Sequence, residues 1–142
     1  MKRSHNQEIE VIIEKNEGHF WGRVEGKGFV PTGQGATVPE LLKNIKESIE
    51  DYVEHEGKKD KFWSKVELPK MKFNIHYDLE AFFEEFNEVK ISSIAKLAGL
   101  NASLVRQYAT GTKYPSSEQA KKVEVAIHTL ANKLQGASIY AG

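Results

Sequence analysis

A short polar face in the C-terminal half of the chain carries the residue types with the clearest chemical use. Its four side chains fall three or four positions apart, the spacing that places residues on one side of a helix: Ser103, Arg106, Gln107 and Thr110. In the major groove of DNA, an arginine can form two hydrogen bonds with guanine, and a glutamine can do the same with adenine. These residues therefore predict a helix over residues 102–110 that reads the edges of bases.

A helix that reads bases needs a second helix and a tight turn to hold it in the groove, and residues 91–110 carry that pattern. Ala95 is a small residue where two steeply crossed helices would meet, and Gly99 is a turn residue that tolerates positive φ. Apolar anchors lie at helical spacing on both sides of the turn: Ile94, Ala98, Leu100, Val105 and Tyr108. The segment is predicted to be a helix-turn-helix. The alternative is an ordinary helical hairpin in which Gly99 is only a C-terminal cap.

Three further polar residues fit the same interpretation. Ser92 and Ser93 begin the first helix, where a backbone amide or a hydroxyl can donate to a DNA phosphate. Asn101 precedes the second helix and is predicted to cap it. Only one arginine lies on the reading helix, so useful specificity is expected to need two copies of the chain on a two-fold operator.

Charge is segregated in this half, although the whole chain has 20 basic and 20 acidic residues. Residues 78–88 carry five acidic side chains and no basic one, whereas residues 89–122 carry six basic side chains against Glu118 alone. A single lysine is more commonly a solvated surface charge. A segregated positive segment around a reading helix is what attraction to phosphates requires, so we expect this patch to contact DNA.

The composition restricts the class of protein. The 142 residues, 39% of them hydrophobic, suit one ordinary globular domain or two small ones. The lack of cysteine excludes disulfides, thiol nucleophiles and thiolate metal sites. The basic start at residues 1–3 is followed by polar residues, and the apolar run at residues 11–13 is too short for a secretion signal. A cytoplasmic location without membrane contact is therefore expected.

Strands are predicted ahead of the helices. Residues 9–15 and 19–25 predict a β-hairpin, residues 29–32 leave room for a short third strand, and the alternating residues 71–77 predict a fourth. Between the third and fourth strands, Thr37 is a capping residue for a helix whose apolar stripe would pack on the sheet. The order of elements is thus β-β-β-α-β.

The predicted fold class is α+β. A β-β-β-α-β module in residues 1–77 is followed by an all-α helix-turn-helix domain in residues 78–142. No Gly/Ser-rich linker separates the two, so they are expected to abut. The glycines before the first helix are assigned to turns, because their spacing fits no phosphate-binding loop: Gly26, Gly28, Gly33 and Gly35.

The candidates for catalysis are weaker. Glu8, Glu10 and Glu14 share one face of the first strand and could hold metal ions in a nuclease of the RNase H type. The predicted strands contain no aspartate, however, and glutamates on an alternating strand more commonly form its solvated side. The five histidines are scattered, with no pair at i, i+4 spacing. We expect no enzymatic activity, no metal site and no cofactor.

Four stretches of the helical half match a known pattern: Ile94-Ala95-Lys96, Ala98-Gly99-Leu100-Asn101, Val105-Arg106-Gln107-Tyr108 and Gly111-Thr112-Lys113-Tyr114-Pro115-Ser116. Through them residues 78–134 resemble the Cro/repressor-type (XRE-like) helix-turn-helix family. The resemblance implies that Thr112 and Lys113, in the loop after the recognition helix, touch phosphate. The last helix has an apolar side that is expected to serve partly as core and partly as a dimer face: Val123, Ile127, Leu130 and Leu134.

Residues 9–15, Gly18-His19-Phe20-Trp21, residues 32–37 and residues 40–44 match a second pattern. Through them residues 8–56 look like the HicB-type antitoxin fold, a degraded RNase-H-like module. Two stretches depart from it: residues 24–28 replace a Pro-Asp-Leu-Pro-Gly-like segment, and Leu41-Leu42 replaces a pair of alanines. Contact residues for a toxin are therefore not carried over.

Together the resemblances imply an antitoxin of a type II toxin-antitoxin pair. Such a protein neutralises a small mRNA-cleaving toxin (HicA-like) by binding it, and represses its own operon through the helix-turn-helix. The expected partners are operator DNA, the toxin, and further copies of the chain in a homodimer or tetramer. The alternative is an XRE-like transcriptional regulator whose N-terminal domain senses a small ligand or makes protein contacts only.

Overall fold

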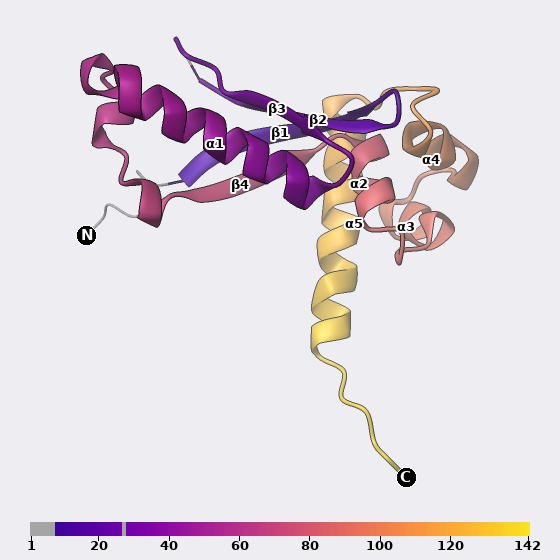
Figure 1. The fold of residues 1–142 in the computed structure, drawn as a ribbon. Coiled ribbons are helices and arrows are strands. Elements are labelled where there is room, and N and C mark those ends of the chain that lie inside the picture. The colour runs from indigo at the N-terminus through magenta and orange to yellow at the C-terminus, as the bar shows by residue number, and fades with distance from the viewer. Residues whose placement is uncertain (1–7, 27) are drawn as a thin grey trace. The chain divides into compact units, whose positions relative to one another are not determined.

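Alternating apolar and polar residues build the N-terminal sheet of the computed structural model, which describes residues 8–26 and 28–142. Its strands are β1 (Glu8–Asn16), β2 (His19–Val24), β3 (Thr32–Gly35) and β4 (Lys72–Tyr77), in the order β3-β2-β1-β4 (Figure 1). β2 runs antiparallel to both β1 and β3, whereas β4 runs parallel to β1. The basic start at residues 1–3 lies outside the described residues.

Helix α1 (Val38–Glu56) begins where the sequence predicts. The Thr37 hydroxyl accepts a hydrogen bond from the Glu40 amide (3.2 Å), and Pro39 lies in the first turn, where it needs no donor. Fully buried side chains of α1 pack on the sheet, among them Leu41, Ile45 and Ile49. Three short 3-10 turns, Gly57–Lys59, Trp63–Lys65 and Leu68–Lys70, then lead to β4. The β-β-β-α-β order is therefore present.

The third strand lies three residues later than predicted, because its glycines belong to the strand. Gly33 and Gly35 were assigned to turns, but both face α1, and a Cβ atom added at Gly35 would lie 2.7 Å from the Leu41 amide nitrogen. The backbone of β3 thus approaches the helix more closely than any side chain permits. The carbonyl oxygen of Gln34 also accepts a hydrogen bond from Asn44 Nδ2 of α1 (2.8 Å).

The division between the two units of the chain falls inside a helix. The first unit ends at Ala81 and the second is Phe82–Gly142, so the boundary lies inside α2 (Leu79–Glu85), four residues past the predicted one. Asp78 Oδ1 caps α2 by accepting from the Ala81 amide (2.7 Å), and the Ala81 side chain is fully buried in the core of the sheet. The first turn of α2 therefore completes the first unit. Burial raises the pKa of Asp78, and the nearby Glu14 carboxylate adds to the effect.

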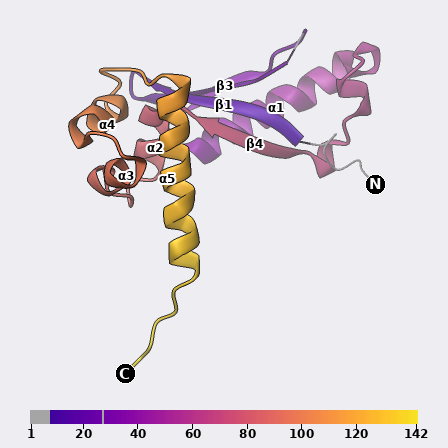
Figure 2. The ribbon, with the colours of Figure 1, turned by 180° about the vertical axis from the view of Figure 1, so that it is seen from behind.

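The second unit contains α3 (Ile91–Ala98), α4 (Ala102–Ala109) and α5 (Ser117–Gln135). Small and apolar residues from all three helices form its core: Ile94, Ala95, Val105, Tyr108, Val123 and Ala126. α3 and α4 lie beside the first part of α5, which continues beyond them (Figure 2). The fold is α+β as predicted, with the strands in the first unit and most of the helices in the second. No helix in the described ranges is both long and apolar enough to span a membrane.

The close contact between β3 and α1 can be tested at Gly35. Substitution of Gly35 by Ala places a methyl group against the backbone of α1, which cannot yield as a flexible side chain can. We expect a loss of about 1–3 kcal/mol in the free energy of unfolding, measured in urea by the fluorescence of the buried Trp63. Gly26→Ala is the control, since nothing lies within 4 Å of a Cβ at that position. Equal stability of the two variants would contradict the packing described.

Candidate nucleic-acid interface

The turn between α3 and α4 has the backbone geometry that the sequence predicts. Gly99 ends α3 in the left-handed conformation, with φ of 70° and ψ of 29°. Its amide donates to the Lys96 and Ala95 carbonyl oxygens, and the Leu100 amide donates to that of Ala95 (2.9 Å). Asn101 Oδ1 then accepts from the Ser103 amide (2.8 Å) and caps α4. Only three residues separate the helices, and each is part of a helix cap or its hydrogen bonds.

The predicted anchors hold α4 from one side. Val105 and Tyr108 are buried on α4, opposite Ile94 and Ala95, which are buried on α3. The Tyr108 hydroxyl donates to Gln119 Oε1, which ties α4 to the first turn of α5. The other anchors, Ala98 and Leu100, are half-buried at the turn. These contacts fix which side of α4 is buried in the core of the unit.

The polar face of α4 lies on the opposite side of the helix. Ser103, Arg106 and Thr110 are exposed and Gln107 is half-buried, at helical positions facing away from Val105. Within the described residues, no hydrogen bond or ion pair holds the Arg106 guanidinium. Its five N–H donors are therefore available to an acceptor from outside the chain.

The loop after α4 folds back onto the end of the helix. The Gln107 carbonyl oxygen accepts from the amides of Thr112 (2.9 Å) and Lys113 (3.2 Å), and from the Thr110 hydroxyl (3.3 Å). The Thr110 and Thr112 hydroxyls are also hydrogen-bonded to each other (2.9 Å). Gly111 permits this reversal with a φ of 77°. The structure therefore brings Thr112 and Lys113, both exposed, next to the C-terminal end of the polar face.

Ser92 and Ser93 lie on the first turn of the other helix, α3, and both are exposed. Exposed lysines flank them, Lys90 just before α3 and Lys96 in its last turn. The nine predicted contact residues thus form a continuous set on α4 and its loop and a separate pair on α3. A polar helix face with cations at its margins can donate to base edges and phosphates together.

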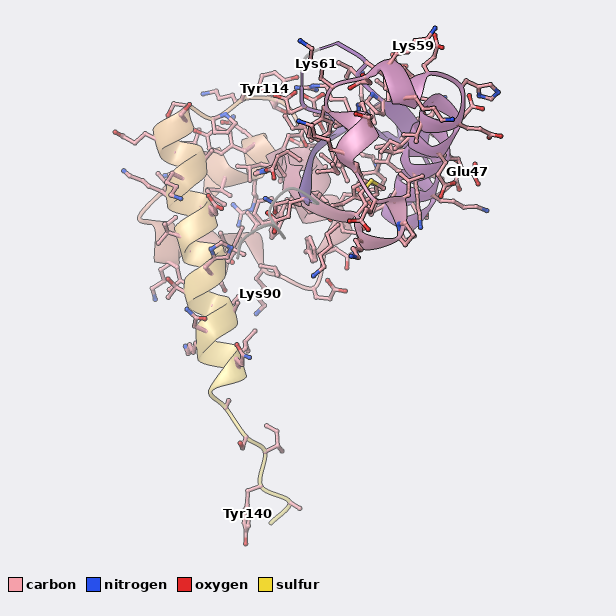
Figure 3. All side chains as sticks on the ribbon, turned by 90° about the vertical axis from the view of Figure 1, so that its left-hand side faces the viewer. Glu47, Lys59, Lys61, Lys90, Tyr114 and Tyr140 are labelled. Atoms are coloured by element: carbon pink, nitrogen blue, oxygen red, sulfur yellow. The ribbon has the colours of Figure 1, made fainter. Side chains whose placement is uncertain are left out.

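Tyr114 is a candidate that the sequence reasoning did not include. Its side chain is 82% exposed in the loop, directly after Lys113 (Figure 3). An exposed aromatic ring can pack on a sugar or a base of a nucleic acid. The signal was present in the sequence, as a lone aromatic residue between Lys113 and Pro115.

The carboxylates considered for a nuclease lie in the first unit, on the sheet face away from α1. Glu10 is hydrogen-bonded to His76 Nε2 (2.6 Å) and to Asn74, and Glu14 pairs with Arg23 (3.1 Å). The hydrogen bonds from His76 and Asn74 hold the pKa of Glu10 below its usual range. Among the described residues, no three histidine or acidic side chains are close enough together to hold a metal ion.

The turn makes a specific demand on its glycine. Gly99→Ala meets no neighbouring atom, so its only cost is the strain of a side chain at positive φ, about 1–2 kcal/mol of unfolding free energy. Gly136→Ala is the matched control, because Gly136 ends α5 with a φ of −80° and has no atom closer than 3.6 Å to an added Cβ. Urea unfolding followed by circular dichroism should separate the two variants. A stable Gly99→Ala variant would show that the turn is not held in this conformation.

The chain matches no protein-family model, no curated protein and no solved structure. The chemistry assigned to the polar face of α4 therefore rests on its residue types, its exposure and the turn that positions it.

Proposed function

We propose that this chain is an antitoxin-type repressor that binds operator DNA through α4 and its following loop, and a small basic ribonuclease through its first unit. The single observation that carries the DNA-binding part is the exposed polar face of α4, with Arg106 unpaired among the described residues, directly opposite the buried Val105 and Tyr108. α4 has eight residues and is about 12 Å long, close to the width of the major groove. A helix of this size can present its polar face to a few base pairs.

The short helix explains why two copies are needed. One arginine and one glutamine can specify a few bases, whereas operators are usually read as two half-sites about one helical turn apart. The proposed DNA-binding form is therefore at least a homodimer of the chain.

The apolar stripe of α5 is the surface we assign to dimerisation. Val123 is fully buried, Ile127 and Leu130 are half-buried, and Leu134 is 64% exposed, although all four lie on one side of the helix. α5 has 19 residues and α3, on which it packs, has eight, so about half of α5 extends beyond the core of its own unit. A second copy of α5 would cover this apolar half. The segment after α5 adds exposed Ile139 and Tyr140, and Figure 3 shows Tyr140 pointing away from the helix.

A charge in the stripe should dissociate the dimer. Leu134→Glu is expected to weaken self-association about tenfold or more, because it places a carboxylate in an apolar contact, without affecting the folded monomer. Val125→Glu is the control, since Val125 is 53% exposed on the opposite side of the same helix. Sedimentation equilibrium measures both. A monomeric parent chain, or equal dissociation by the two variants, would refute the assignment.

The β-β-β-α-β order and the sheet of the first unit support the ribonuclease-binding part, together with the likeness of residues 8–56 to the HicB-type fold. We propose that the chain itself has no catalytic role and acts by covering its partner. The alternative function, a regulator that senses a small ligand, shares the DNA-binding half and differs only in what the first unit binds. Binding of the protein encoded beside this chain's gene separates the two.

The role of α4 is tested at its arginine. Arg106→Ala should lower the affinity for the promoter fragment upstream of the chain's own reading frame by about 1–3 kcal/mol, and relax the preference at one base position. Lys46→Ala is the charge-matched control, since Lys46 is an exposed residue of α1 in the first unit, outside both the polar face and the stripe of α5. Gel-shift titrations measure the affinity. For the parent chain they should also show a steep loss of binding as salt rises.

An unchanged gel shift for Arg106→Ala would remove α4 as the reading helix. Binding that does not depend on salt would point to a protein-only role for the second unit.

A further inference from the structure

The sheet of the first unit has one covered face and one open face. α1 covers the face that carries Ile9, Val11 and Ile13 of β1, and these side chains are buried. Among the described residues of the first unit, no other element lies over the opposite face. In Figure 2 the strands lie in front of α1, so the open face is turned toward the viewer.

Two rows of side chains cross the open face. In one row, Trp21 of β2 lies between Gln34 of β3 and Glu14 of β1. In the next row, Arg23 of β2 lies between Thr32 and Ile12, and Ile12 lies beside His76 of β4. The rows bring together an indole that is 42% exposed and a half-buried isoleucine, both surrounded by polar side chains. This combination is typical of the centre of a protein interface.

A hollow of about 330 Å³ lies between the two rows. Trp21 and Arg23 line one side of it, Thr32 and Gln34 line the other, and the paired glycines Gly22 and Gly33 lie between them. Gly22 and Gly33 face Ile45 of α1 on the other side of the sheet, so backbone alone forms the floor of the hollow between the two rows. The hollow is large enough for one side chain of a partner.

Several charged groups of the open face are already held in place. Glu14 and Glu25 bind Arg23 from two sides, at 3.1 and 3.3 Å, and Glu10 binds His76 and Asn74. Ordering these side chains on binding therefore costs little entropy.

Two groups on the same face remain available. The side chains of Gln34 and Thr32 have no hydrogen-bond partner in the described residues and can bind groups of a partner.

The open face carries an excess of negative charge. Four carboxylates lie on or beside it, against the cations of Arg23 and Lys72 and the imidazole of His76: Glu8, Glu10, Glu14 and Glu25. Acidic and basic surfaces attract each other and orient the encounter, so the chemistry of this face suits a basic partner.

We infer that the open face of the sheet is the docking surface for a small basic protein, and that the hollow beside Trp21 receives an apolar side chain from it. This inference rests on the proposed function, in which that protein is the ribonuclease encoded beside the chain. Trp21 is the expected anchor of the interface, because it combines a large apolar area with partial exposure. The paired carboxylates around Arg23 and His76 form its rim.

The test uses the full chain and the purified product of the neighbouring reading frame in isothermal titration calorimetry. Trp21→Ala should weaken binding at least tenfold. Glu14→Lys should also weaken it, since it replaces a negative charge by a positive one on the face that meets a basic partner and breaks the pair with Arg23. Glu47→Ala is the control, an exposed residue of α1 on the other side of the sheet, and should leave binding unchanged (Figure 3). Thermal unfolding of each variant checks that it is folded.

A second measurement leaves the surface intact. The chain has two tryptophans, so labelling with 5-fluorotryptophan yields one fluorine resonance for Trp21 and one for Trp63. Binding of the partner should shift the Trp21 resonance, whereas that of Trp63, which is 3% exposed, should stay in place.

The possible results are distinguishable. Binding that is unaffected by Trp21→Ala and Glu14→Lys, with an unshifted Trp21 resonance, overturns the docking surface and leaves the proposed function standing. No binding by the parent chain overturns the ribonuclease-binding part of the proposed function, and this inference with it. If Trp21→Ala lowers the molecular mass measured for the protein in solution without the partner, the face pairs with a second copy of the chain. The inference is then wrong.

Discussion

One-sided burial is the physical constraint on which both units of this protein depend. In a chain of 142 residues, each element is packed against the core on one side only. The sheet is packed against a single helix, and α5 is packed along only part of its length. Hydrophobic burial stabilises each unit through the covered sides. The uncovered sides keep polar, charged and a few large apolar residues, and these are the surfaces to which we assign binding.

Glycine serves this constraint in two ways. At Gly35 the absence of a side chain lets β3 approach the backbone of α1, so that a single helix seals the covered face of the sheet. At Gly99 the same absence permits positive φ, which ends α3 and starts α4 after three residues. Gly35 is required because no side chain fits in the space, and Gly99 is required because of its backbone conformation. Both place one side of an element in a core and thereby decide which side remains outside.

Arg23 and Arg106 show how the surroundings decide the use of a residue type. Arg23 is held between Glu14 and Glu25, so its charge is largely neutralised and its side chain acts as a rigid part of the sheet surface. Arg106 has no such partner in the described residues and projects from a helix with no carboxylate in its first turn. The first suits a preorganised protein interface, and the second suits recognition of a base or phosphate.

The sequence by itself determined the elements whose signals are local: the cap at Thr37, the turn at Gly99, the buried anchors Val105 and Tyr108, and the α+β order. Local signals suffice there because caps and periodicity act within one or two turns. The third strand was misplaced, since the glycines of β3 are explained by α1, which lies elsewhere in the sequence. Only the tertiary structure decided the pairing of Glu10 with His76 and the hollow beside Trp21. The pairing joins strands that are far apart along the chain, and the hollow depends on the register between β2 and β3.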